Sequence, residues 1–519
     1  MDRSGYTLLP TTDGTSQGAP GRVVKADRRR IYQSLLFTVA LFWLLAAILF
    51  KDPVYQWLFY TRKYHFNTMK PDVDRLVAGS TESNIVWDRL AEMTDTFGPR
   101  LAGSEALEKS IDWIVDKVKE DNLSVTTEDV IVDYWQRHEE SLHFLSPTRG
   151  PLKMHILGLG YSVSTPDPVR GLEAEIIVAH SKEELDQLGS TGQVKGRIVL
   201  WNQPYKGYGA AWPANIPMAS ISAEDADLLE RSLERHLHDP TNFKEWPRVH
   251  LVMGATTERN AKVSRNIIIE LKGRERPEEV VVVGGHIDSW DVGSGAVDDG
   301  AGCFIAWETI RQLSRLERPP RRTVRVVFWT AEENTSSGGE VYAKNHPESA
   351  SSRHVFAFES DVGVFDPYGI AYNPGRHSQK DAFEVMTHAG NYFLGSRKDL
   401  GYTGAGHHVL PNGEGADIDP LCYQGVACAM FTPADPFPLP YPTSPYATEE
   451  SIEAFKRLEQ QMRRGSSRED GRRPVDSGYF YYHHTEADTM GVFTPDQLKR
   501  SAAAMAIWTY IAAELQIEL

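Results

Sequence analysis

The chain of 519 residues is long enough for two domains, or for one large domain with additions. Hydrophobic residues make up 41% of the sequence, so a sizeable core is available. The formal net charge is −16, from 55 basic and 71 acidic side chains. A surface with this excess of negative charge repels a phosphate backbone, which argues against nucleic acid as a partner.

The N-terminal region predicts a membrane anchor. Residues 1–30 are polar and typical of a disordered tail, whereas residues 31–50 are mostly apolar. A stretch of about 20 residues is the length that a membrane-spanning helix needs. Because Arg28, Arg29 and Arg30 precede it, the positive-inside rule predicts a cytosolic tail, a signal-anchor and a single-pass type II protein. The rest of the chain would then be lumenal or extracellular.

The alternative to the anchor is a cleaved signal peptide, which would give a secreted protein; no small-residue cleavage motif stands before Lys51. We interpret residues 51–80 as a stalk. Asn122-Leu123-Ser124 fits the N-glycosylation pattern, as does Asn334-Thr335-Ser336, although the second adjoins the candidate site described below.

The residues after the stalk predict helices and then a strand. Residues 85–97 and 104–122 have helical periodicity, and Ser104 offers an N-cap with Glu105 and Glu108 in the first turn. Residues 130–135 are typical of a strand. We assign residues 81–150 to the N-terminal part of the main domain.

Residues 151–255 differ in character from the flanking sequence. Short strands are expected at 175–179, 196–201 and 250–253, separated by many turn residues. The pattern predicts a mainly β accessory subdomain.

From residue 256 onward, strands and helices alternate. The apolar runs at 267–271, 280–284, 324–330 and 355–359 are typical of strands buried on both faces of a sheet. Residues 301–316 and 497–517 are expected to be helical. The alternation predicts an α/β fold with a mixed sheet flanked by helices in residues 256–519. The proline-rich and then charged residues 433–473 are interpreted as a surface insertion.

The three cysteines, Cys303, Cys422 and Cys428, lie in or near apolar runs and show no zinc-finger spacing. Buried free thiols are the favoured interpretation, with a Cys422–Cys428 disulfide as the alternative.

Acids and histidines follow several of the predicted strands. His286 comes just after the strand at 280–284, Glu332 and Glu333 follow Thr330, and Asp361 follows the strand at 355–359. In open α/β sheets, sites form at the carboxyl ends of strands. We therefore expect these side chains to meet, and His484 to join them from a later loop.

Imidazole nitrogens and carboxylate oxygens are ligands for zinc, and a catalytic site keeps a position open for water. Two cations sharing one carboxylate would acidify a water and neutralise the clustered acids. An adjacent carboxylate that is not a ligand would serve as general base, as one member of the Glu332–Glu333 pair. Taken singly, each motif is more often a turn or a solvated surface; their joint occurrence at strand ends favours a two-metal hydrolase.

From about residue 81 to the C-terminus, the chain resembles the M28 family of zinc metallopeptidases, and within it the carboxypeptidase Q branch. The resemblance is densest in residues 284–302, 329–333, 359–363, 413–418 and 479–490, with a further match at 201–209. It implies the zinc-exopeptidase (phosphorylase/hydrolase-like) fold with an inserted PA-like subdomain.

The resemblance also implies the ligands of two zinc ions. Asp298 would bridge both ions, His286 and Asp361 would complete one set, and Glu333 and His484 the other. Glu332 would be the general base.

Further roles follow from the same resemblance. Asp288 would orient His286, and Asp488 would do likewise near His484. The Asp298–Asp299 peptide is expected to be cis.

Three positions near the substrate have alternative interpretations. His483 is either an oxyanion donor or a stacked structural histidine. Residues 413–418, with Gly413, Glu414 and Asp417, form either part of the substrate pocket or a plain Gly-rich turn.

The chain departs from this family in two places. After residue 209, the sequence runs almost directly into residues 216–218, so the accessory subdomain is reduced or the gene model is truncated. The insertion at 433–473 is longer than expected and precedes His484.

The prediction is a membrane-anchored di-zinc exopeptidase for dipeptides or short peptides with free termini, with a homodimer as a possible assembly. The alternatives are a non-catalytic receptor on the same fold and an acyltransferase of the glutaminyl cyclase type. The full ligand set argues against both. Whether cleavage is of the amino-, carboxy- or dipeptidase type stays open, as does the native metal, since cobalt or manganese fit the same ligands.

Overall fold

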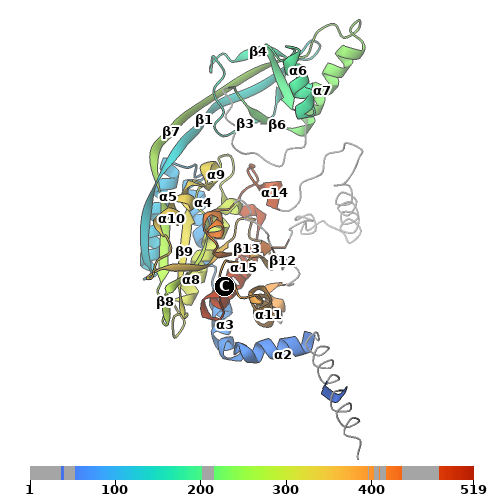
Figure 1. The fold of residues 1–519 in the computed structure, drawn as a ribbon. Coiled ribbons are helices and arrows are strands. Elements are labelled where there is room, and N and C mark those ends of the chain that lie inside the picture. Colours follow the sequence, from blue (N-terminus) through green and yellow to red (C-terminus); the bar gives the residue numbers. More distant parts are fainter. Residues whose placement is uncertain are drawn as a thin grey trace, which may run out of the picture. The chain divides into compact units, whose positions relative to one another are not determined.

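The computed structural model describes residues 37–39, 53–201, 216–395, 397–402, 408–409, 416–434 and 479–519 (Figure 1). The chain forms two compact units, Met1–Phe59 and Tyr60–Leu519, and the second carries the features below. Most of the expected anchor, Gly413 and Glu414, and nearly all of the expected insertion lie outside the described residues. Among the residues that are described, no helix has the length and apolar character required to span a bilayer.

The N-terminal helices are α2 (Pro53–Lys63), α3 (Phe66–Thr81), α4 (Ile85–Phe97) and α5 (Glu105–Glu120). The expected helices at 85–97 and 104–122 are confirmed, and the Ser104 side chain caps α5 by accepting from the Leu107 amide. The stalk differs from the expectation, because α3 packs in the main core. Its apolar residues recur at helical spacing and are buried, from Phe66 to Val77.

The main sheet mixes parallel and antiparallel strands (Figure 1). Its order is β12 (His408–Val409), β11 (Pro367–Asn373), β13 (Ala427–Pro433), β10 (Arg353–Glu359), β8 (Arg276–His286), β9 (Arg322–Trp329), β7 (Arg248–Leu271), β1 (Ser124–Ser146) and β2 (Gly150–Met154). β8 is parallel to β9 and β10, and β10 is parallel to β13. β7 is antiparallel to β9 and β1. The predicted mixed α/β sheet is therefore confirmed.

Helices cover both faces of this sheet. Within β8, Val281 and Val283 belong to one core cluster and Val280 and Val282 to another, as the alternation of a strand requires. The first cluster includes buried residues of α8 (Ala301–Leu313), α11 (Ala382–Leu394) and α15 (Pro495–Glu514). The second includes residues of α10 (Ser337–Asn345) and α12 (Asp419–Tyr423). The short helices are η1 (Ala296–Gly300), α9 (Glu332–Thr335), η2 (Lys398–Leu400), α14 (Tyr479–Tyr482) and η5 (Met490–Val492).

β1 and β7 are much longer than the predicted strands. The segments expected separately at 250–253 and 267–271 belong to one strand, β7, which pairs with β1 along its length. The two strands pass from the main sheet into the accessory part, with register shifts between Val132 and Tyr134 and between Arg137 and Glu140. These shifts let the paired strands bend without ending.

The accessory part contains β3 (Ile156–Gly158), β4 (Leu172–Ala179), α6 (Lys182–Ser190), β5 (Arg197–Trp201), β6 (Ala219–Ile221) and α7 (Ala223–His238). The expected strands at 175–179 and 196–201 are confirmed. Two helices make this part mixed α/β rather than mainly β, and Leu229 and Leu233 of α7 pack in its core with Ile176. The sequence that suggested a shortened subdomain falls largely on residues 202–215, outside the described residues.

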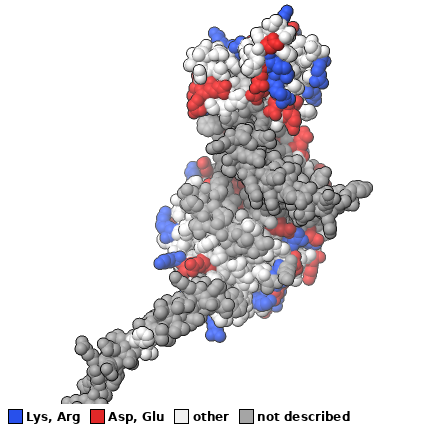
Figure 2. All heavy atoms as spheres, turned by 90° about the vertical axis from the view of Figure 1, so that its right-hand side faces the viewer, with Lys and Arg blue, Asp and Glu red and all other residues white. Residues whose placement is uncertain are grey.

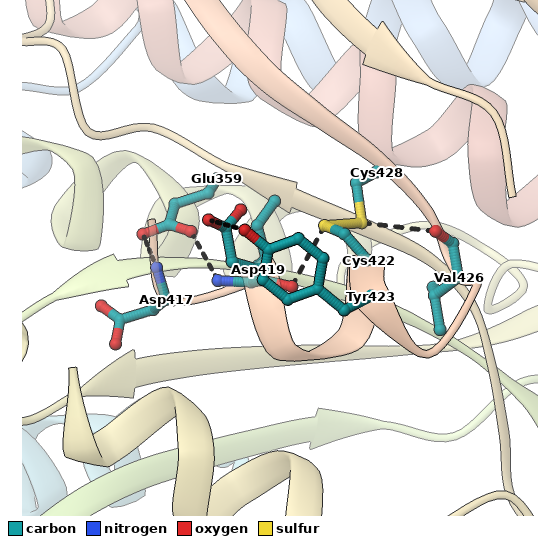
Figure 3. The surroundings of a disulfide bond; sticks show 8 residues. Glu359, Asp417, Asp419, Cys422, Tyr423, Val426 and Cys428 are labelled. Atoms are coloured by element: carbon teal, nitrogen blue, oxygen red, sulfur yellow. Dashed lines mark hydrogen bonds between the residues drawn. A yellow bond between two sulfur atoms is a disulfide. The ribbon is translucent and has the colours of Figure 1, made fainter. Parts of the chain in front are cut away.

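Cys422 and Cys428 form a disulfide, so the favoured interpretation of free thiols is wrong for this pair (Figure 3). α12 ends just before β13 begins, and this turn brings the two Cα atoms to 5.8 Å. Cys303 is a buried free thiol, as expected.

Charges of both signs are interspersed on the face drawn in Figure 2. Where that face is drawn in colour, acidic and basic side chains alternate rather than forming one acidic area.

Candidate metal centre

The parallel strands carry the predicted ligands to one edge of the sheet. His286 is the last residue of β8, Glu333 lies in α9 directly after β9, and Asp361 follows β10 by two residues. His286 is opposite Trp329 in β9, and Gly284 is opposite Glu359 in β10, so these strand ends are in register.

The first set of candidate ligands surrounds the His286 imidazole. Its Nε2 atom lies 3.1 Å from Asp298 Oδ1 and 3.4 Å from Asp361 Oδ1. His286 and Asp298 are almost fully buried.

The second set surrounds the His484 imidazole. Its Nε2 atom lies 3.1 Å from Asp298 Oδ2 and 2.8 Å from Glu333 Oε2. Asp298 therefore presents one carboxylate oxygen to each set. The Asp298–Asp299 peptide is cis, as expected.

These distances fit metal ligands. Two ligand atoms that each lie about 2.1 Å from a tetrahedral zinc ion are separated by about 3.4 Å. The nitrogen–oxygen separations of 2.8 to 3.4 Å approach this value. In addition, ligand atoms of His286, Asp298 and Glu333 all lie within 4.8 Å of one another, as do those of Asp298, His483 and His484. The imidazole and carboxylate donors are the types that zinc prefers.

The electrostatics of the centre also favour bound cations. Burial raises the pKa of Glu333 to about 7, and burial together with Asp361 raises that of Glu359 to about 8. Burial would raise the pKa of Asp298 too, but the neighbouring imidazoles, His483 first among them, hold it well below its usual value. Positive charge at this position would let the buried acids remain ionised together.

Asp288 contacts both the His286 ring and the Glu332 main chain. His286 Nδ1 lies 3.0 Å from the Asp288 carbonyl oxygen, so an Nδ1–H donor there leaves Nε2 free to face Asp298 and Asp361. The Asp288 carboxylate accepts from the Glu332 amide at 3.1 Å. The hydrogen bond to the ring is thus through the main chain. The Asp288 carboxylate lies 3.7 Å from the same ring nitrogen and also fixes the start of α9.

Asp488 lies beside the centre but contacts the main chain near Asp298. Its Oδ1 accepts from the Val297 amide at 2.6 Å. This contact fixes the residue before Asp298, whereas the sequence had suggested a contact with His484.

His483 is the second histidine beside Asp298. Its ring stacks on that of His484 with centroids 3.4 Å apart, and its Nε2 atom lies 3.5 Å from Asp298 Oδ2. Burial lowers the pKa of His483 to about 4. A neutral ring of this kind can donate one hydrogen bond at the edge of the centre.

Asp417 and Glu359 form a buried acidic pair behind the centre (Figure 3). Glu359 accepts from the amides of Asp417 and Ile418 at 3.3 and 3.0 Å. The Asp417 carboxylate has no hydrogen-bond partner among the described residues, and its pKa is raised well above the usual value by burial and then by Glu359.

Arg100 is a functional residue that the sequence did not indicate. Its buried guanidinium donates to the carbonyl oxygens of Ile287, Ser294 and Gly295 at 2.8, 2.7 and 2.8 Å. These bonds fix the loop between His286 and Asp298. Because the acceptors are main-chain atoms 187 to 195 positions away, residue types give no signal for the pairing.

The fold and this centre define a class, and comparison with known proteins agrees. The model for peptidase family M28 matches residues 266–509. Together with the relatives described next, this match shows that the chain belongs to peptidase family M28 and is a metallopeptidase.

Carboxypeptidase Q of Bos taurus is 31% identical over 494 residues, covering 87% of this chain and 90% of the relative. Carboxypeptidase Q of Mus musculus is 32% identical, covering 83% and 86%. The chain is therefore carboxypeptidase Q-like over most of its length.

Two solved structures resemble this one. A peptidase M28 precursor from Shewanella amazonensis SB2B has a TM-score of 0.66 at 25% identity, covering 88% of this chain and 98% of that one. A zinc aminopeptidase from Bacillus subtilis has a TM-score of 0.54 at 17% identity, with coverage of 83% and 95%, which supports the shared fold.

Proposed function

We propose that the protein is a di-zinc exopeptidase that hydrolyses dipeptides or short peptides with free termini. The observation that carries this proposal is the position of Asp298, with one oxygen 3.1 Å from His286 Nε2 and the other 3.1 Å from His484 Nε2. His286, Asp298 and Asp361 would hold one ion, and Asp298, Glu333 and His484 the other. When bound, the zinc ions acidify water and polarise the scissile carbonyl.

Glu332 is the proposed general base. It precedes the ligand Glu333 at the start of α9, and its amide is held by Asp288 at 3.1 Å. Its carboxylate is in the electrostatic field of His286 and Asp361. From this position, Glu332 takes the proton of the attacking water and returns it to the leaving amine, which is ordinary general base and then general acid chemistry.

Other side chains position these groups. Asp288 sets the tautomer of His286, and Asp488 fixes the backbone before Asp298. His483, stacked on His484, is assigned as a hydrogen-bond donor to the developing oxyanion.

The substrate class is inferred from the relatives. The curated relatives that match most of this chain are carboxypeptidases, and the B. subtilis neighbour is an aminopeptidase. Enzymes that cleave beside a chain end need a free terminus, and we assign its recognition to the segment that contains Gly413, Glu414 and Asp417. A receptor or a cyclase-type acyltransferase is disfavoured because both ligand sets are complete.

Localisation and assembly are part of the proposal. We propose that residues 31–50 anchor the protein, with its catalytic part lumenal or extracellular. We also propose that residues 151–255 form a PA-like subdomain. Finally, we propose that two copies of the chain associate as a homodimer. Protease protection in microsomes tests the anchor: protected catalytic residues and a digested N-terminal tag support it. Release of the whole protein into the lumen would point to the secreted alternative.

The test of the function combines zinc analysis with dipeptide hydrolysis on the wild type, Glu332→Gln and a control, Glu340→Gln. Glu340 is an exposed glutamate of α10, in the same region of the chain. We expect two zinc ions in all three proteins, and turnover lower by about 100-fold to 10,000-fold in Glu332→Gln alone.

Unchanged turnover in Glu332→Gln would remove it as the base. A wild type that binds no zinc, or that binds zinc and cleaves no short peptide, would overturn the proposed function.

A further inference from the structure

One side chain of the long strand β1 binds the loop that carries the metal ligands. The Arg137 guanidinium forms two hydrogen bonds with the Asp291 carboxylate, Nε to Oδ2 at 2.7 Å and Nη2 to Oδ1 at 2.9 Å. Only 10% of the Arg137 side chain and 18% of the Asp291 side chain are exposed. Paired, two-pronged contacts of this kind fix orientation as well as distance.

Arg137 also binds the accessory part. Its Nη1 atom donates to the Gly158 carbonyl oxygen at the end of β3 and lies 3.2 Å from Glu140 Oε2. The Glu140 carboxylate in turn accepts from the Gly158 amide at 2.8 Å. A single guanidinium therefore joins β3 of the accessory part to the loop after β8.

Trp290, the residue before Asp291, is enclosed by the same elements. Its ring is 3% exposed and packs edge to face on Trp135, with centroids 6.1 Å apart. A Cβ atom built on Gly160 would lie 1.9 Å from Trp290 Cη2. The absence of a side chain at Gly160 thus makes room for the indole.

Trp290 contacts two of the three candidate ligands of the second metal set, Glu333 and His484. Its amide donates to Glu333 Oε1 at 3.1 Å, and its ring packs edge to face on the His484 ring, with centroids 6.1 Å apart. Because Glu333 Oε2 is the atom that faces His484, the amide bond to Oε1 sets the rotation of that carboxylate.

The structure assigns to Arg137 a role as a positioning residue: through Asp291 and Trp290, it fixes Glu333 and His484, two of the three ligands of one of the two proposed zinc ions. This inference rests on the proposed function. It makes the affinity of that one zinc depend on a residue of β1 and on its contact with the accessory part. Among the described residues, the ligands of the other ion have different contacts: His286 Nδ1 lies 3.0 Å from the Asp288 carbonyl oxygen, and the Tyr479 hydroxyl lies 3.5 Å from Asp361 Oδ1.

The test measures the two zinc affinities separately, by competition with a calibrated chelator, in the wild type and Arg137→Met. Partners that orient metal ligands typically change metal affinity by about 10-fold to 100-fold. We expect a loss of this size for the zinc held by Glu333 and His484, and none for the zinc held by His286 and Asp361. We also expect kcat at limiting zinc to fall as that ion is lost, and KM at saturating zinc to change little.

Arg265→Met is the matched control. Arg265 lies on β7, is similarly part-buried, and pairs with Glu108 and Asp112 of α5. Its removal should lower stability without changing either zinc affinity. Arg137→Lys keeps the charge but loses the two-pronged contact, and it should give an intermediate affinity.

Gly160→Ala tests the same contact independently, because it leaves the Arg137–Asp291 ion pair intact. It should displace the Trp290 ring and weaken the same zinc ion. If Arg137→Met fails to fold, Asp291→Asn and Gly160→Ala carry the test.

Two results would overturn the inference while leaving the peptidase assignment in place. One is an equal loss of affinity for both zinc ions. The other is that Arg137→Met, Asp291→Asn and Gly160→Ala bind zinc as tightly as Arg265→Met does. A wild type without zinc would instead overturn the proposed function.

Discussion

The strands of the main sheet and those of the accessory part differ in what surrounds them. In β8, β9 and β10, most residues are buried, and an acid or histidine of the metal centre lies at the end of each strand or a few residues after it. In β4 and β5, partly exposed residues are interspersed with buried ones, and the core beneath them is smaller. Neither candidate metal group includes an accessory residue.

The difference in burial indicates that the main sheet is the rigid part that holds the metal ligands, and that the accessory part is less rigid. A strand buried on both faces holds its end residues rigidly, and ligand atoms must be held to fractions of an ångström. The accessory part needs less rigidity, since it acts on the centre through a few contacts such as Arg137 with Asp291. The predictions below test this division.

The largest effect is expected for Asp298→Ala. Removing the shared carboxylate takes one ligand from each metal set, so zinc binding and hydrolysis should both fall by more than the roughly 100-fold loss that changes in surrounding residues produce. Plasma emission analysis and dipeptide turnover measure this. Two zinc ions retained at full occupancy would contradict the shared role.

Two large-to-small substitutions compare the stability of the main core with that of the accessory core. Ile305→Ala in α8 and Leu229→Ala in α7 each remove a buried side chain, and each should cost about 2 to 5 kcal/mol of stability. Hydrogen exchange should show faster exchange across the main sheet for Ile305→Ala, and faster exchange confined to the accessory part for Leu229→Ala. Faster exchange in β8 and β10 of Leu229→Ala would contradict the distinction between the two parts.

Removing the disulfide is expected to change stability less than these core substitutions do. Replacing both Cys422 and Cys428 by Ser opens a loop with a sequence separation of 6. The loss of stability should be about 2 kcal/mol, measured by denaturant unfolding. Activity should fall as well, because α12 begins beside the amides that hold Glu359. Unchanged stability in the double variant would contradict this.

The smallest effect at neutral pH concerns His354 of β10. Its Nε2 atom accepts from the Tyr342 hydroxyl at 2.9 Å, and burial lowers its pKa to about 3. Its unfolded pKa is about 6.5, so the unfolded state binds more protons between those values and stability falls as pH drops below about 6.5.

The wild type should therefore lose about 2 kcal/mol from this residue by pH 5, relative to neutral pH. His354→Gln and His354→Phe should share a flatter dependence of stability on pH, which separates the loss of the titrating group from changes in packing. Slopes equal to that of the wild type would show that His354 does not titrate in this way.

The strands and helices of the main domain were predictable because their patterns are local. A few consecutive residues contain the valine run that forms β8. A few others contain the Ser104 cap of α5. The candidate ligands were predictable because strand ends converge and because the motifs around them are specific to a family.

Features that depend on distant partners were not predictable. The continuity of β7 was missed because its middle, near Asn260, is polar and exposed. The Cys422–Cys428 bond depends on how α12 turns into β13. The contacts of Arg100 and Arg137 join residues more than 150 positions apart, which no local pattern records.

The most direct test of the metal centre is a crystal structure of the zinc-loaded protein with anomalous data at the zinc edge. Two peaks are predicted. One lies at about 2.0 to 2.2 Å from ligand atoms of His286 and Asp361, and the other at the same distance from Glu333 and His484, with Asp298 bonded to both. Zinc held elsewhere, or an Asp298 that touches neither ion, would contradict the account.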